Sequence, residues 1–92
     1  FIDDIPVMDS MKIEPELSFG FDSPSGRIII LIATSSDSRE SIEKFYSSVM
    51  PQLGWELFGK QYHRGEEKFQ FISSNNLNGL IWRLSITPLT IP

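Results

Sequence analysis

The chain has no cysteine and only one histidine, His63, among its 92 residues. Without cysteine it can form no disulfide and offers neither a thiolate metal ligand nor a cysteine nucleophile. One histidine cannot supply the several ligands that a structural metal site needs. It would also be the only base for a Ser-His-Asp triad, and no G-x-S-x-G motif accompanies it. We therefore expect no catalytic residues, no metal site and no cofactor.

Positive charge is also scarce. Eight lysines and arginines stand against twelve aspartates and glutamates, giving a formal net charge of −4. The basic residues are spread along the chain, which argues against a nucleic-acid or phosphate-binding surface. The longest apolar run, residues 28–33, is far shorter than the roughly 18 residues of a membrane-spanning helix. No dinucleotide-binding, Walker or EF-hand motif is present.

Two pairs of adjacent acids are the remaining candidates for a site. Adjacent carboxylates can serve acid–base chemistry or bind calcium. However, Asp3-Asp4 falls in an extended arm and Glu66-Glu67 falls at a turn. Charged residues in such segments are mostly solvated, and we interpret both pairs in that way.

Residues 37–55 carry the pattern of a helix with both ends marked. Asp37 and Glu40 match a capping box at the start. The apolar residues then recur at the spacing of one buried stripe: Ile42, Phe45, Tyr46, Val49 and Met50. Pro51 cannot extend the helix, and Gly54 can adopt the left-handed conformation that closes a helical end. This segment therefore predicts a helix that lies on a sheet.

Strand patterns surround this helix. We expect strands at residues 17–22, 27–34, 55–58, 68–73 and 80–87, with the third continuing as 61–64 after a bulge or short turn at Gly59. Turn residues at 23–26, 65–66 and 78–79 separate them. The order β-β-α-β-β-β predicts an α+β two-layer sandwich, with one helix on a mainly antiparallel sheet of four to five strands.

The domain organisation follows from the prolines and the remaining apolar residues. Residues 1–16 contain Pro6 and Pro15 and hold no periodicity, so we expect an extended arm that docks on the domain or on a partner. Residues 17–92 form a single domain. Residues 28–32 are apolar on both faces of their strand, and one helix can cover only one of these faces. The arm, the C-terminal tail or a second subunit must cover the other.

Three motifs resemble a family of small, uncharacterised bacterial exported domains. They are D-I-P-V-M at residues 4–8, F-D-S-P-S-G-R at residues 21–27 and F-Y-S-S-V-M-P-Q-L-G-W at residues 45–55. The resemblance implies a periplasmic or otherwise exported domain, with no assigned activity and no catalytic residues to carry over. Since the chain begins at Phe1 rather than at methionine, a signal peptide or lipid anchor would lie upstream.

We hypothesise that the chain is a non-enzymatic cell-envelope domain that binds another protein, or itself, through a sheet face or an open strand edge. The aromatic and apolar residues that are hardest to bury form the candidate interaction surface: Ile29, Leu31, Trp55, Tyr62 and Ile81. The alternative is a small-ligand carrier with a pocket between helix and sheet, near Phe45, Tyr46, Trp55 and Trp82.

Overall fold

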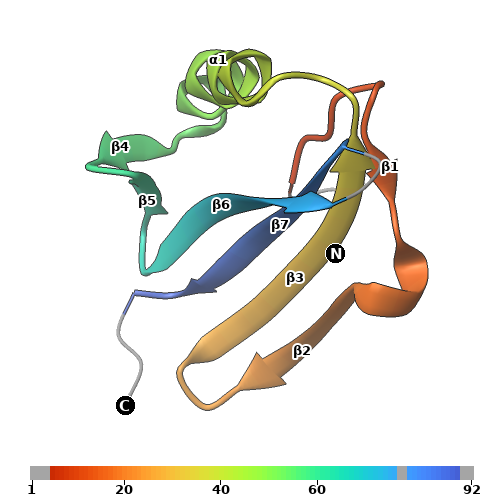
Figure 1. Cartoon of the computed structure of the whole chain (residues 1–92). Helices are drawn as coiled ribbons and strands as arrows, with labels where there is room; N and C mark the ends of the chain where they lie inside the picture. Colours follow the sequence, from red (N-terminus) through yellow and green to blue (C-terminus); the bar gives the residue numbers. More distant parts are fainter. Residues whose placement is uncertain (1–4, 77–78, 90–92) are drawn as a thin grey trace.

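The computed structural model describes residues 5–76 and 79–89. The two acids at residues 3–4 and the turn expected at residues 78–79 fall wholly or partly outside this range. The described elements, in chain order, are β1 (Lys12–Ile13), η2 (Pro15–Leu17), β2 (Phe19–Ser23), β3 (Gly26–Ser35), α1 (Arg39–Val49), η3 (Pro51–Leu53), β4 (Glu56–Phe58), β5 (Gln61–Arg64), β6 (Glu67–Asn76) and β7 (Gly79–Pro88) (Figure 1).

Most of the described chain belongs to one antiparallel sheet. Its seven strands run in the order β1-β3-β7-β6-β5-β4, and β2 pairs with the same edge of β3 as β1, nearer the start of that strand. The expected α+β sandwich with four to five strands in the order β-β-α-β-β-β is therefore wrong. The described residues form a mostly antiparallel sheet with one short α-helix.

Two local features account for the extra strands. At Gly59 the chain reverses through a two-residue turn, because Gly59 has a φ of 64° and Phe58 pairs with Gln61 across it. Hence β4 and β5 are separate strands. In the arm, Lys12 and Ile13 pair with Thr34 and Ala33 at the end of β3. A two-residue strand of this kind has no sequence period of its own.

The helix begins one residue later than the sequence suggested. The side chain of Ser38, not of Asp37, caps it by accepting a hydrogen bond from the Ser41 backbone N–H at 3.1 Å. Asp37 instead accepts hydrogen bonds from Ser10 and Ser35, and so joins the arm to the loop before α1. The predicted end is confirmed, since α1 stops before Pro51 and Gly54 has a φ of 90°.

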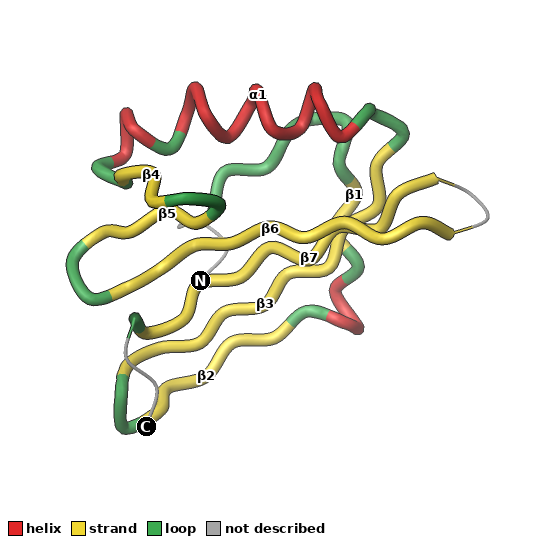
Figure 2. The backbone as a smooth tube through the Cα atoms, turned by 60° about the vertical axis from the view of Figure 1, so that its left-hand side comes forward, coloured by secondary structure: helices red, strands yellow, loops and turns green. Residues whose placement is uncertain are grey.

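One face of the sheet packs under α1 (Figure 2). The helix contributes Ile42, Tyr46 and Met50, all fully buried. The strands, together with Trp55 just before β4, contribute the other side of this core: Ile29, Leu31, Ala33, Trp55, Tyr62, Phe69, Trp82, Leu84 and Ile86. The predicted apolar stripe of the helix is confirmed as its packing face.

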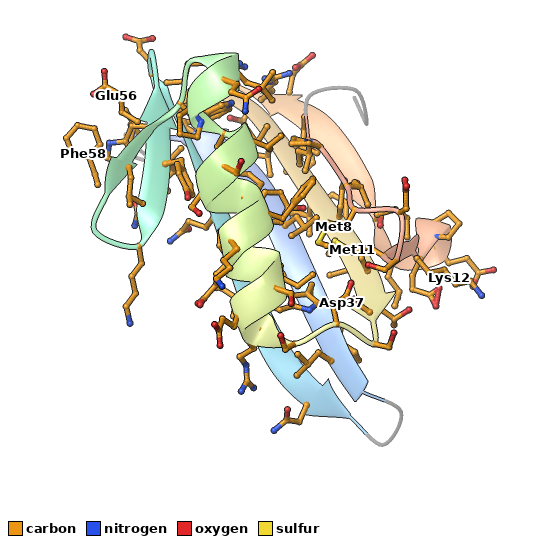
Figure 3. The ribbon with its side chains drawn as sticks, turned by 90° about the horizontal axis from the view of Figure 1, so that it is seen from above. Met8, Met11, Lys12, Asp37, Glu56 and Phe58 are labelled. Carbon is orange, nitrogen blue, oxygen red and sulfur yellow. The ribbon has the colours of Figure 1, made fainter. Side chains whose placement is uncertain are left out.

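The arm packs on this same face. Ile5 and Met11 are buried in the core, and Figure 3 shows Met8 and Met11 beside the helix. The Tyr46 hydroxyl donates a hydrogen bond of 2.8 Å to the Pro6 carbonyl oxygen. Docking of the arm on the domain is thus confirmed. Among the described residues, neither the arm nor the helix covers the second face of the sheet.

Candidate interaction surface

The structure buries most of the surface expected from the sequence. Ile29, Leu31, Trp55 and Tyr62 are each at most 4 % exposed and belong to the core. Those four assignments are wrong, because the helix, the arm and the Trp55 region all gather on one side of the sheet. Ile81 is half-buried and lies on the other side.

The register of the strands shows which residues share the uncovered face. Residues directly opposite each other in an antiparallel pair point to the same side. Ile30 pairs with Phe19 and Ser85, while Ile32 pairs with Arg83. Arg83 in turn pairs with Ile72. None of these residues belongs to the core under α1, so they lie on the opposite side of the sheet.

We name this side the open face. Its apolar residues are Phe19, Phe21, Ile28, Ile30, Ile32, Phe58, Ile72 and Ile81. Phe19, Phe21, Phe58 and Ile72 are 49 %, 52 %, 54 % and 55 % exposed, and the others are half-buried. The rings of Phe19 and Phe21 stack with their centroids 5.9 Å apart. Exposed apolar residues gathered on one face are typical of contact sites.

The charge of the open face differs in sign from that of the whole chain. By register it carries three bases, Lys12, Lys68 and Arg83, and one acid, Glu56. The other residues of the chain therefore hold five of its eight bases and eleven of its twelve acids. In Figure 3 Glu56 lies at the outer edge of the sheet, far from Lys12. A partner that matched this face would be apolar and would carry few positive charges.

His63 and Arg64 lie next to each other in β5 but point to opposite faces. The His63 ring stacks on Phe58 with centroids 4.7 Å apart, and its Nε2 lies 3.2 Å from the Gln61 amide oxygen. Arg64 places its guanidinium 4.4 Å from the centre of the Trp55 ring on the helix side. The residues do not converge, and in the described parts of the chain no three acids or histidines are grouped to hold a metal.

The space between helix and sheet, where the sequence allowed a ligand pocket, is filled by aromatic side chains. Tyr46 contacts Phe69 and Phe71, with ring centroids 5.3 and 5.0 Å apart. Trp55 and Trp82 are buried, and in the described chain their indole N–H groups have no hydrogen-bond partner. These buried side chains therefore pack against one another in the region where the ligand pocket was expected.

A depression of about 420 Å³ lies to one side of this core, between α1 and the β4–β5 hairpin. Its lining is mixed, with Glu43 and Lys44 from the helix and Leu57 and Tyr62 from the hairpin. Glu40 and Lys60 also line it, so charged groups of both signs surround its apolar residues.

Comparison of the chain with protein families, with curated proteins and with solved structures finds no match. Across the described residues, no helix combines the length and the apolar character needed to cross a membrane.

Proposed function

We propose that this chain is a non-enzymatic binding domain that recognises protein through the open face. The observation that carries the proposal is the exposure of Phe19, Phe21 and Ile72 on a sheet face that α1 and the arm leave uncovered. Phe19 and Phe21 lie directly opposite Ile30 and Ile28 of β3, while Ile72 lies across the same face, opposite Arg83. Exposed apolar side chains gathered on one face in this way favour an interface over a solvated surface.

The three motifs that resemble bacterial exported domains support a place in the cell envelope, periplasmic or otherwise exported. Residues 45–55 also have a structural role in this chain, since they form the buried stripe and the end of α1. We therefore base the binding proposal on the open face and the compartment on the motifs. Detection of the native protein in fractionated cells tests the compartment separately.

Site-specific photo-crosslinking tests the binding proposal. A photoreactive phenylalanine analogue at Ile72 should give a discrete protein adduct in cells, because this residue is 55 % exposed on the open face. The same analogue at Leu57 is the matched control, as Leu57 is 58 % exposed but lies on the helix side of the sheet. Ile32→Lys should abolish the Ile72 adduct by placing a desolvated charge in the interface.

Adducts of equal yield at Ile72 and Leu57, or an Ile72 adduct that survives Ile32→Lys, would contradict binding through the open face. Circular dichroism of each variant establishes that the fold is kept. A partner bound on the helix side would give the reverse pattern, with the adduct at Leu57 alone.

A further inference from the structure

The two edges of the sheet differ in how far they are protected against pairing. On one side the sheet ends at β4, which has only three residues and continues into a turn that carries Lys60. Beyond the end of β5, this side is formed by residues 70–76 of β6, which pair with β7. On the other side it ends at β1 and β2. Short length and a lysine are devices that discourage pairing at an edge. The β4 edge is therefore protected.

The β2 edge has none of these devices. Its five residues, F-G-F-D-S, contain no proline, lysine or arginine. They pair with β3 without interruption from Ser23 to Phe19, so no bulge bends the strand away. Asp22 is its only charge. A regular, apolar strand with a free edge can accept another strand.

The register indicates which backbone groups this edge presents. The Ser23–Gly26 pair closes a two-residue turn, and in such hairpins the closing pair exchanges hydrogen bonds with itself. Alternation then directs the N–H and C=O of Phe21 and Phe19 towards β3. The same alternation directs those of Gly20 and Asp22 outward, away from the sheet.

We propose that the occupant of this edge is a second copy of the chain, paired antiparallel along β2 about a two-fold axis at Phe21. In this register Gly20 of each copy faces Asp22 of the other, and four backbone hydrogen bonds form. Phe21 faces Phe21 of the second copy, an aromatic pair that stabilises neighbouring strands. The open faces of the two copies then join into one surface.

Charge favours this arrangement over stacking of two open faces. Face-to-face contact would bring together Lys12, Lys68 and Arg83 of both copies against only Glu56. Edge pairing places Asp22 opposite a glycine, so no two like charges face each other. Since both copies use the same strand, the pairing is two-fold symmetric and closes at a dimer rather than growing into a fibre.

Sedimentation equilibrium of the purified chain tests the proposal. The wild type should show a monomer–dimer equilibrium, and Gly20→Pro should weaken it by at least about tenfold, because proline removes an outward donor in each copy. Gly20 does not have a positive φ, and its N–H is directed away from β3, so proline there removes no hydrogen bond of the chain's own sheet. Leu57→Pro is the matched control, because the Leu57 backbone N–H is directed away from β5 at the other edge of the sheet. This variant should dimerise like the wild type.

A second test, which does not depend on proline, places opposite charges at Phe21 in two variants. Phe21→Lys and Phe21→Glu should each be monomeric alone, because like charges then meet at the two-fold axis. Mixed together they should form a heterodimer. A wild type that remains monomeric at about 0.5 mM, or a mixture that stays monomeric, would overturn the proposal.

This inference rests on the proposed binding role but can fail separately from it. Loss of the dimer with retention of the Ile72 adduct refutes the edge pairing alone. A dimer without that adduct refutes binding through the open face alone.

Discussion

Replacing Phe69 with alanine should lower the free energy of unfolding by about 3–5 kcal/mol, as expected for removal of a fully buried aromatic side chain. Phe69 is 0 % exposed and lies at the centre of the aromatic cluster, with its ring near those of Tyr46, Trp55 and Tyr62. The cavity left behind cannot close easily, because its walls belong to the helix and to three strands. Urea denaturation followed by circular dichroism measures the loss.

Ile72→Ala is the matched control, three residues along the same strand. Ile72 is 55 % exposed on the open face, so its truncation should change the free energy of unfolding by less than about 0.5 kcal/mol. Equal losses for the two variants would mean that both faces of the sheet are packed, contrary to the structure.

Tyr46→Ala should have a comparable effect, a loss of about 3–5 kcal/mol, because Tyr46 joins three parts of the fold. Its ring packs from α1 against Phe69 and Phe71 of the sheet, and its hydroxyl donates to the Pro6 carbonyl in the arm. Tyr46→Phe keeps the ring and should lose only about 1 kcal/mol at neutral pH. A limited-proteolysis assay should also show faster cleavage before Met11 in the alanine variant.

The two Tyr46 variants should differ from the wild type at alkaline pH. Burial raises the pKa of Tyr46 well above its ordinary value of 10.0. Above about pH 10 the unfolded chain therefore loses this proton while the folded chain keeps it, so stability falls as the pH rises. Tyr46→Phe should reduce this fall. The alkaline loss of stability that remains in this variant comes from Tyr62, because burial also raises the pKa of Tyr62. An unchanged alkaline slope in Tyr46→Phe would contradict the burial of the hydroxyl.

Much of the local structure followed from the sequence. The apolar stripe at Ile42, Tyr46 and Met50 predicted the packing face of α1, and Pro51 and Gly54 predicted its end. The turns at residues 23–26 and 65–66 were also predicted. These features depend on residues close together in the chain, where spacing and backbone preference are sufficient.

The missed cap and the missed strand β1 depend on contacts between distant residues, unlike the turn at Gly59, where the sequence allowed either a bulge or a short turn. The cap was assigned to Asp37, but Ser10, 27 residues away, engages that carboxylate and Ser38 takes the capping role. Strand β1 exists because the end of β3 offers it a partner. Neither contact leaves a pattern in the local sequence, and so the fold class and the strand count were wrong.

The sequence also contains a pattern that indicates which residues share the open face. A two-residue turn at Pro24-Ser25 places Phe21 opposite Ile28 and Phe19 opposite Ile30. The even-numbered isoleucines of β3 therefore share a face with the two phenylalanines. Ile29 and Leu31 must then be on the other face, which is where the structure buries them.

Hydroxyl-radical labelling with mass spectrometry tests the central claim most directly, because it reports the exposure of individual side chains in solution. At concentrations where the protein is monomeric, Phe19, Phe21 and Ile72 should be oxidised rapidly, while Tyr46 and Phe69 should be protected. Protection of Phe19, Phe21 and Ile72 to the level of Phe69 in the monomer would contradict an open sheet face, and with it the proposed mode of binding.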